Sequence, residues 1–509
     1  MSQFVIGIDI GTTQTKGVVI DADGGIVKEA AREATLISRR PTWAEEDPRQ
    51  WWDNTVEIVR ELLDDREVRQ GRVHAVGVSG MVPAMVLLGP SGEPLRPSIQ
   101  QNDARSGREV QELKTEFGDD EFFRRTGGSL NQQVVAPKMR WLRRHEPEVV
   151  ESLATLFGSY DYVNFMLTGE RTVEQNWALE SGLLDVHDAD WADDLIALAT
   201  LSRDQLPRIV SSTEVVGSVT RAAAAATGLP EGTPVVGGAA DHVASAFVTT
   251  AYANGDLVVK FGGAGDVLYS QSELVTDKRL FIDHHIVPGH YYLNGCMATS
   301  GSLVKWFVQN FASDAVEAAE RDGLSPYQFL DLAAANVPVG SGGLVVLPYF
   351  LGEKTPLHDP NARGTILGLG LHHGQAHVYR AILEAVAYGF RHHVDVLDER
   401  ELPVTRVLAA DGGAKSDVWM QITANVLGRP VQRLASHPGS SLGAAFVAGM
   451  GVGVFDAWTD IERYVELSRP FEPEEAAVDV YDRLYPVYRT AYERLKDVFP
   501  TLTEIEANA

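Results

Sequence analysis

Residues 5–21 read VIGIDIGTTQTKGVVID, and this stretch decides the fold. An apolar, largely β-branched run at Val5–Ile10 is followed by a turn of glycine and threonine at Gly11–Thr15, then by a second apolar run at Lys16–Asp21. This pattern predicts two antiparallel strands joined by a tight turn. The turn DADGG then begins a third strand at Ile26, so we expect the chain to open with a β-meander.

The same layout returns halfway along the chain. The segment DLVVKFGGAGDVLYS at 256–270 is again an apolar strand, a glycine-rich turn and another strand, which indicates two halves built on one plan. Helical patterns lie between the two, at Pro48–Leu63, at 221–230 and at Asp103–Phe117, where Asp103 is expected to cap the helix. Strands alternating with such helices predict α/β domains.

Length and charge limit the classes of function. A chain of 509 residues exceeds the size at which one hydrophobic core stops growing, so two or more domains are expected. The 70 acidic residues outnumber the 44 basic ones and give a formal net charge of -26. Binding to nucleic acid or to an anionic membrane relies on basic side chains, so we exclude both as partners.

The cysteine content and the first residues indicate the compartment. Cys296 is the only cysteine, which excludes an intrachain disulfide. The opening MSQFVIGIDIG lacks the basic start of a signal peptide, and no apolar run reaches the ~20 residues of a membrane helix. We therefore expect a soluble, cytoplasmic protein.

Five stretches together carry a family resemblance. They are DIGTTQTKG (9–17), GSYDYVNFMLTGE (158–170), GGAADH (237–242), the long segment 352–389 that begins GEKTPLHDP, and the segment 411–431 that begins DGGAKSDVW. The chain resembles the FGGY family of carbohydrate kinases from its first strand to about residue 450, and VVAPKMRWLRRHEPE (134–148) is similar to the branch of that family that acts on D-xylulose.

The resemblance implies a particular architecture. The expected fold is α/β, with two actin-like (ribonuclease H-like) domains and an interdomain cleft. We expect residues 1–247 to carry the sugar site, the phosphate turn and the catalytic acid, and residues 248–509 to carry most of the ATP site. The last helix, at about 476–497, is expected to pack back on the first domain.

The first turn is a candidate phosphate and metal site. A carboxylate repels bare phosphate, but Mg²⁺ is commonly held by one or two carboxylates together with substrate phosphates, which gives Asp9 a role as metal ligand. The phosphate would lie against Gly11, Thr12 and Thr13, with Lys16 as a cationic neighbour. The alternative is an ordinary hairpin with a polar turn.

The other ATP contacts are expected in the second half of the chain. The turn at Gly262 and Gly263 would hold the far side of the phosphates, although Ala264 stands where the family usually has a hydroxyl. The resemblance places the adenosine at Gly412 and Gly413, with Ser416 at the start of the next helix. Trp306 is expected either to line the base pocket or to belong to the core.

Phosphoryl transfer to a sugar hydroxyl also needs a base. Asp241 follows the apolar, glycine-rich run PVVGGAA, and the resemblance places the catalytic base here. The alternative is a helix N-cap for the segment that follows. His242 is expected to contact the sugar or to support the base.

The remaining sugar contacts depart from the family. The D-xylulose branch has a Met-His pair where this chain has Met81 and Val82, and valine cannot hydrogen-bond a hydroxyl. Asp103 and Arg105 lie in an element similar to the family's NDxR and are further candidates; the alternative is a helix cap and a surface ion pair.

We therefore expect an ATP- and Mg²⁺-dependent carbohydrate kinase that converts D-xylulose to D-xylulose 5-phosphate. A kinase for another ketose or a polyol, such as ribulose or erythritol, stays open as an alternative. From another class, an actin-like ATPase without a sugar substrate stays open too. The expected partners are a small sugar and ATP, with a homodimer as the form of self-assembly considered.

Overall fold

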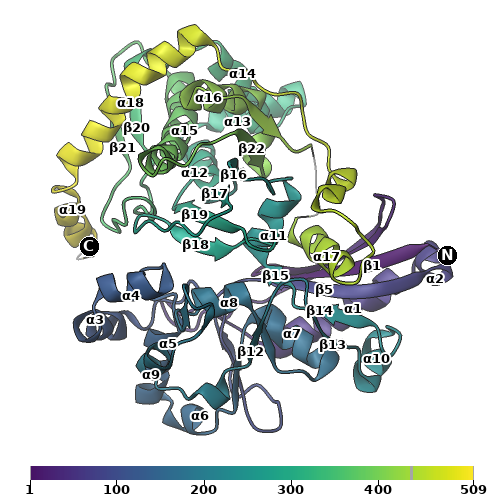
Figure 1. Cartoon of the computed structure of the whole chain (residues 1–509). Helices are drawn as coiled ribbons and strands as arrows, with labels where there is room; N and C mark the ends of the chain where they lie inside the picture. Colours follow the sequence, from purple (N-terminus) through teal and green to yellow (C-terminus); the bar gives the residue numbers. More distant parts are fainter. Residues whose placement is uncertain (1, 436–438, 508–509) are drawn as a thin grey trace. The chain divides into compact units, whose positions relative to one another are not determined.

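The computed structural model describes residues 2–435 and 439–507. The chain divides into two compact units, and Figure 1 colours the chain along its sequence. The first unit comprises Met1–Tyr252, Ser272–Tyr292 and Ser436–Val465, and the second comprises Ala253–Gln271, Leu293–Ala435 and Glu466–Ala509. The first unit therefore takes two segments from the second half of the sequence.

The first unit is built on a sheet of mixed direction, with the order β13-β14-β5-β1-β2-β3 and with β15 also paired to β5. The expected β-meander is confirmed, because β1, β2 and β3 pair antiparallel in sequence. Parallel pairing joins β1 to β5, and β5 to β14 and β15. The strands are β1 (Gln3–Ile10), β2 (Gln14–Asp21), β3 (Ile26–Glu33), β5 (Arg72–Gly80), β13 (Val215–Ser218), β14 (Pro234–Val236) and β15 (Ala239–Ala240).

Shorter elements complete this unit. The remaining strands are β4 (Glu45–Glu46), β6 (Val86–Leu88), β7 (Ser98–Ile99), β8 (Thr155–Phe157), β9 (Thr172–Glu174), β10 (Leu184–Asp185), β11 (Asp190–Trp191), β12 (Arg208–Val210) and β18 (Phe281–His284). The helices are α1 (Pro48–Leu63), α2 (Arg66–Gln70), α3 (Gly107–Glu116), α4 (Asp119–Thr126), α5 (Val135–His145), α6 (Pro147–Glu151), α7 (Ser159–Thr168), α8 (Gln175–Glu180), α9 (Asp193–Leu198), α10 (Arg221–Thr227), α11 (Asp241–Val248) and α17 (Ser440–Gly451), with 3-10 turns η1 (Arg203–Gln205) and η4 (Trp458–Tyr464).

The second unit repeats the plan of the first, as the two similar hairpins predicted. The strands of its main sheet that belong to this unit follow the order β19-β17-β16-β22-β23, in which β16 pairs antiparallel with β17 and parallel with β22. The strands are β16 (Asp256–Phe261), β17 (Gly265–Gln271), β19 (Tyr291–Met297), β20 (Val345–Leu347), β21 (Thr365–Leu367), β22 (Arg406–Ala410) and β23 (Val431–Arg433). The helices are α12 (Gly301–Phe311), α13 (Ser313–Asp322), α14 (Pro326–Ala335), α15 (Gln375–Glu399), α16 (Asp417–Leu427), α18 (Glu475–Leu495) and α19 (Phe499–Ala507), with 3-10 turns η2 (Ser341–Gly343) and η3 (Gly412–Lys415).

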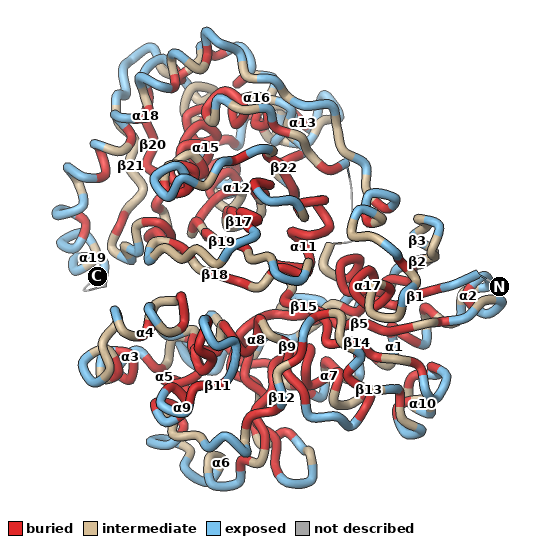
Figure 2. The backbone as a smooth tube through the Cα atoms, viewed as in Figure 1, coloured by how far each residue is buried: buried red, intermediate tan, exposed pale blue. Residues whose placement is uncertain are grey.

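Both faces of the first sheet are covered by helices. Nearly every residue of β1 and β5 is buried, which Figure 2 shows in red, and strands buried on both faces are typical of parallel pairing. Helix α17 packs on β1 and β5 at one face, while α7 packs on β5 and α1 packs on β2 and β3. The predicted helix Pro48–Leu63 is confirmed as α1.

Small residues let α17 lie unusually close to the sheet. A Cβ atom at Gly7 would come within 1.9 Å of the Ser441 carbonyl oxygen, and one at Gly77 within 2.2 Å of the Ala444 oxygen. On the other side of the helix, a Cβ at Gly443 would lie 2.6 Å from the Ala244 oxygen of α11. Glycine is therefore required where β1, β5, α17 and α11 stack.

The long motif of the second half of the chain has a structural role in α15. The buried Glu384 carboxylate accepts hydrogen bonds from Gly340 N at 3.0 Å and from Ser341 Oγ at 2.8 Å. Arg380 Nε and the Tyr481 hydroxyl of α18 also donate to it, each at 2.9 Å. One carboxylate thus joins α15, the turn before β20 and α18, and α18 packs on α16 and β20 of the second unit.

The prediction for 103–117 is wrong at its start. Helix α3 begins at Gly107 with Ser106 at the N-cap, and Asp103 instead pairs with Arg105. The predicted helix at 221–230 is confirmed as α10, which ends at Gly228 in the left-handed conformation. Among the helices that the structure describes, none is long and apolar enough to span a membrane.

The close packing of α17 can be tested at Gly7. We expect Gly7→Ala to lower the free energy of unfolding by about 1–3 kcal/mol or more, because the new methyl group would overlap backbone atoms. Gly107→Ala is the matched control, since a Cβ there meets no atom within 4 Å, and it should leave stability nearly unchanged. Urea unfolding followed by circular dichroism measures both variants; equal midpoints would contradict the packing described here.

Candidate functional site

The strand register brings two predicted site residues to one edge of the first sheet. Asp9 of β1 pairs with Ser79 of β5, and Ser79 also pairs with Ala239 of β15. Asp241 follows β15 directly, so the two acids lie at the carboxyl ends of two parallel strands that flank β5. With strands about 4.8 Å apart and about 3.3 Å per residue, their backbones are separated by about 12 Å. The carboxyl edge of such strands is where α/β sheets bind ligands.

Asp9 is held toward the first turn. The Ser79 hydroxyl donates a hydrogen bond to Asp9 Oδ1 at 2.9 Å, and Asp9 Oδ2 lies 3.9 Å from the place that a Cβ at Gly11 would occupy. Lys16 pairs with Asp9 across the hairpin and is exposed, so both side chains emerge on the same face. A Cβ at Gly11 would also lie only 2.9 Å from the Gln14 carbonyl oxygen, so the tight turn beside the carboxylate requires glycine.

The residues of this turn have the chemistry of a phosphate and magnesium site. Thr13 is exposed and Thr12 half-buried, so their hydroxyls and backbone amides border solvent. Mg²⁺ prefers oxygen ligands and retains several waters, which a single oriented carboxylate beside an open glycine turn can accommodate. Asp9 and its neighbours therefore fit the ion that the sequence predicted, and the roles of Gly11, Thr12, Thr13 and Lys16 stay predictions.

Asp241 is the first residue of α11, and Ala240 occupies the N-cap position. The alternative interpretation of Asp241 as a helix cap is therefore wrong, although Asp241 Oδ1 accepts a hydrogen bond from the backbone N of His242 at 2.6 Å. A carboxylate in the first turn of a helix is stabilised in its charged form by the helix dipole. Its side chain is 35% exposed, so a substrate hydroxyl can reach it.

His242 lies among three carboxylates. Its Nδ1 is 3.5 Å from Asp241 Oδ1, while its Nε2 is 3.2 Å from Asp283 Oδ2 and 3.8 Å from Glu180 Oε1. Burial by itself lowers the pKa of His242, but the Asp283 charge and the close Asp241 carboxylate together raise this pKa well above its ordinary value. Burial raises the pKa of Glu180 well above its usual range, and the Asp283 charge adds to the effect.

The predicted sugar residues Met81 and Val82 follow β5 at the same edge. Met81 N donates to the Ile10 carbonyl at 3.3 Å, and the Ser159 hydroxyl donates to the Met81 carbonyl at 2.9 Å. Both side chains are buried, with 1% and 6% exposed. Val82 therefore presents an apolar wall here, with no hydrogen-bonding group, and contact of either residue with a sugar stays a prediction.

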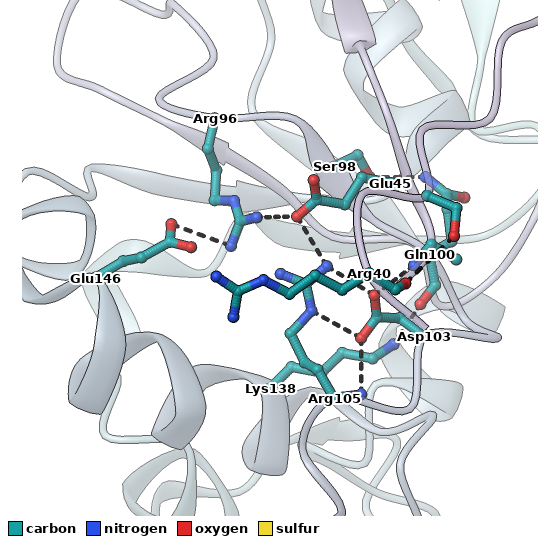
Figure 3. Close-up of polar contacts among 11 residues, drawn as sticks. Arg40, Glu45, Arg96, Ser98, Gln100, Asp103, Arg105, Lys138 and Glu146 are labelled. Atoms are coloured by element: carbon teal, nitrogen blue, oxygen red, sulfur yellow. Dashed lines mark hydrogen bonds and ion pairs between the residues drawn. The ribbon is translucent and has the colours of Figure 1, made fainter. Parts of the chain in front are cut away.

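Asp103 and Arg105 form a buried pair, shown in Figure 3, so the surface ion pair considered above is wrong. Arg105 Nε donates to Asp103 Oδ1 at 2.8 Å, Arg105 Nη2 lies 2.8 Å from Glu45 Oε1, and the Ala44 amide donates to Asp103 Oδ2 at 2.6 Å. The guanidinium stacks 3.8 Å above Trp43. Within the described chain, Arg105 Nη1 has no hydrogen-bond partner, so it is the atom of this pair best suited to bind a hydroxyl.

Further charged side chains surround this pair. Arg96 contacts Glu45 and lies 3.3 Å from Glu146. Lys138 Nζ donates to the carbonyls of Gln100 and Gln133, each at 2.9 Å, and burial lowers the pKa of Lys138 to about 7. These contacts fix the backbone that carries Asp103 (Figure 3).

In the second unit, the two predicted glycine turns are neighbours at the carboxyl ends of parallel strands. Lys260 of β16 pairs with Ala410 of β22, and each strand is followed at once by its turn. A Cβ at Gly263 or at Gly412 would meet no atom within 4 Å, so both glycines border open space. A Cβ at Gly413 would instead lie 2.6 Å from the Trp419 ring, so close packing requires glycine at this position.

The turn at 262–264 is fixed by the following helix. The carbonyl of Gly262 accepts from Gly301 N at 2.7 Å, and the carbonyl of Gly263 accepts from Ser300 N at 2.9 Å and from Ser302 Oγ at 2.7 Å. These bonds satisfy backbone donors at the start of α12. The amides of the turn are thereby held in one arrangement.

Two other predicted nucleotide residues have defined surroundings. Ser416 is the N-cap of α16, where its hydroxyl oxygen accepts from Trp419 N at 3.1 Å. Trp306 is half-buried on α12, with its ring 4.7 Å from Phe350 and 5.0 Å from Phe311 between centroids. Contact of Ser416 or Trp306 with a nucleotide stays a prediction.

Several residues around these sites escaped the sequence interpretation. Asp411 has φ of 74°, which is unusual for a residue other than glycine, and its carboxylate lies 4.0 Å from Lys260 Nζ. Lys260 also lies 3.8 Å from Asp266. Asp411 could have been identified from the sequence, because it begins the motif DGGAK. Glu180 and Asp283 lie in no recognisable motif, and only the fold brings them to the site.

The chain matches known proteins along nearly its whole length. Residues 4–248 match the N-terminal domain of the FGGY family of carbohydrate kinases, and residues 258–452 match its C-terminal domain. The xylulose kinase of Bacillus subtilis is 28% identical over 509 residues, which cover 99% of this chain and 100% of the relative. The gluconokinase of the same organism is 26% identical over 509 residues, with 99% of each chain covered.

Solved structures agree with the sequence relatives. The crystal structure of xylulose kinase from Rhodospirillum rubrum has a TM-score of 0.93 and 47% sequence identity, and the match covers 97% of this chain and 99% of that one. The resemblance seen in the five sequence stretches is thus confirmed, together with the two-domain α/β fold. The chain belongs to the FGGY family of carbohydrate kinases and is an ATP-dependent sugar kinase.

Proposed function

We propose that this kinase phosphorylates D-xylulose to D-xylulose 5-phosphate, with Asp241 as the base and Mg²⁺ as the metal. The observation that carries the site assignment is the strand register that puts Asp9 and Asp241 at one edge of the first sheet. The substrate is supported by relatives named xylulose kinase in Bacillus subtilis and in Escherichia coli, the latter 29% identical over 494 residues. The 47% identity to the Rhodospirillum rubrum xylulose kinase supports it further.

In this proposal Asp241 accepts the proton of the sugar hydroxyl. The hydroxyl oxygen then forms its bond to the γ-phosphorus while the bond from that phosphorus to the ADP oxygen breaks. Asp241 lies in the first turn of α11, where the helix dipole favours the charged form of a carboxylate, and the charged form is the one that can accept a proton. The 35% exposure of its side chain gives the hydroxyl access.

The nucleotide is assigned to the second unit and the metal to the first. Gly263 and Gly412 border open space, so their backbones can approach phosphate and adenosine closely. When bound, Mg²⁺ would neutralise charge on the phosphate oxygens. Asp9 would hold the ion, and Ser79 keeps the Asp9 carboxylate oriented for it.

Other sugar substrates remain alternatives within the proposal, which also covers the cellular compartment and the oligomeric state. The gluconokinase relatives and the apolar Val82 favour a test of other sugars, including ribulose and erythritol. The acidic composition and the family both fit a cytoplasmic enzyme, and a homodimer is the assembly proposed. Measuring ADP release and phosphorylated product across a panel of free sugars decides the substrate; ADP release that no sugar stimulates would instead favour an actin-like ATPase.

The role of Asp241 predicts a large loss of turnover in Asp241→Asn. Asparagine keeps the shape but cannot accept the proton, so kcat should fall by about 10²–10⁴ while ATP binding changes little. Asp190→Asn serves as control, because Asp190 pairs with Arg203 at the surface. Steady-state kinetics and nucleotide titration calorimetry test the pair; turnover within about threefold of the parent would remove Asp241 as the base.

The metal assignment predicts a selective effect of Asp9→Asn. Losing the carboxylate should raise the Mg²⁺ concentration needed for half-maximal rate while leaving sugar binding nearly unchanged, since Asp9 is assigned to the metal alone. Mg²⁺ titrations of the rate, with sugar binding followed by intrinsic tryptophan fluorescence, measure the two effects. An unaltered Mg²⁺ titration would contradict the assignment.

The apolar wall at Val82 predicts a gain of affinity in Val82→His. If D-xylulose binds here, a restored hydrogen bond worth about 0.5–3 kcal/mol should lower KM by about 2- to 150-fold. Val82→Ala is the control, because it removes bulk without adding a donor. Specificity constants of the parent and of both variants on D-xylulose, L-xylulose, D- and L-ribulose, erythritol and glycerol test this. If the parent is inactive on D-xylulose but fast on another of these compounds, the assignment of D-xylulose as substrate is wrong, while the assignment as a sugar kinase stands.

A further inference from the structure

We propose that His242 is a positioning residue, held as an imidazolium chiefly by Asp283, and that its charge keeps the neighbouring Asp241 ionised. This inference rests on the proposed function, in which Asp241 is the base. It assigns a role to two acids that carry no sequence motif, on α8 and β18 of the first unit.

The geometry gives each ring nitrogen of His242 an acidic neighbour. Nδ1 faces Asp241 Oδ1 at 3.5 Å, and Nε2 faces Asp283 Oδ2 at 3.2 Å and Glu180 Oε1 at 3.8 Å. A neutral imidazole carries a proton on one nitrogen only, whereas the imidazolium presents a proton to both sides. An arrangement of acids on both sides therefore favours the charged ring.

The supporting acids are fixed by the fold. Asn176 of α8 clamps β18, because its Nδ2 donates to the His284 carbonyl at 3.0 Å and its Oδ1 accepts from His284 N at 2.6 Å. Asp283, the residue before His284, is only 1% exposed, and Glu180 ends α8. The clamp thus places both acids on the side of His242 that faces away from Asp241.

The charged groups around His242 come from three elements. They are Asp241 on α11 itself, Glu180 on α8 and Asp283 on β18, with the buried Glu174 of β9 beyond them. Helix α17, which packs on α11, has no titratable side chain in Ser440–Gly451, and the titratable residues of β5 lie at the end remote from α11.

The His242 ring lies between Asp241 on its Nδ1 side and Asp283 on its Nε2 side. Burial raises the pKa of Glu180 well above its usual range, so Glu180 keeps its proton to higher pH than an ordinary glutamic acid. Burial also raises the pKa of Glu174 to about 7. The pKa of His242 itself is raised despite burial, because Asp283 and Asp241 favour the charged ring.

The consequence for catalysis is a base that stays ionised to lower pH. An opposite charge within about 4–6 Å lowers the pKa of a carboxyl group by about 1–3 units, and without it the remaining acids would raise that pKa. Because only ionised Asp241 can accept the proton, removing the positive charge should make the rate fall at a higher pH.

His242→Gln tests this through the pH dependence of kcat. We expect the acid limb to move to higher pH by about 1–3 units, since glutamine keeps a polar side chain but loses the charge. A pure sugar contact would instead raise KM and leave the limb in place, which would overturn the proposal. Asp190→Asn is the control and should move neither quantity.

A second measurement follows the histidine directly and needs no activity. Hydrogen exchange at the His242 ring C2 position, read by mass spectrometry of the full chain, should give a midpoint above the ordinary value of about 6.5. Asp283→Asn should lower that midpoint, and Glu180→Gln should lower it less; thermal melting identifies a variant that fails to fold. A parent midpoint at or below the ordinary value would overturn the proposal.

The two measurements separate this inference from the proposed function. If Asp241→Asn retains turnover, Asp241 is not the base, and the catalytic part of the inference is overturned with it. If Asp241→Asn is inactive but His242→Gln does not move the acid limb of the pH dependence of kcat, Asp241 remains the base and only the role inferred for His242 is wrong.

Discussion

The parallel pairing of β1 with β5, and of β5 with β15, is the constraint on which the candidate site depends. It fixes Asp9, Met81 and Asp241 at one edge of one sheet, although Asp9 and Asp241 lie more than two hundred residues apart in sequence. The pairing is secured by α17, which approaches the strands so closely that Gly7 and Gly77 cannot carry a side chain. The positions of the acids are therefore set by backbone contacts remote from the chemistry.

In the second unit, parallel strand pairing positions the two glycine turns that are assigned to the nucleotide. Its parallel strands β16 and β22 bring the two glycine turns together, and Gly263 and Gly412 face open space. Asp411, the residue before Gly412, adopts φ of 74°. This backbone conformation costs energy in residues other than glycine, and such conformations cluster at functional sites. The long α15, joined to α18 through Glu384, supplies the rigid background against which these turns are held.

Local patterns predicted much of this structure. The hairpins, helix α1 and the repeated plan follow from periodicity, glycine turns and capping, which act over a few residues. Contacts between distant segments could not be foreseen in this way. The sequence predicted Asp103 as a helix cap, whereas in the structure Asp103 pairs with the buried Arg105, which also contacts Glu45. Asp283 can be recognised as a neighbour of His242 only from the fold, in which Asn176 of α8 binds β18.

The order of segments along the chain has a consequence for how the protein is made. The first unit needs α17, whose residues Ser440–Gly451 follow most of the second unit in sequence. During synthesis from the N-terminus, the glycine face of β1 and β5 therefore stays uncovered until the ribosome has translated most of the second unit. The first unit thus completes its core late, and this apolar face is exposed in the interval.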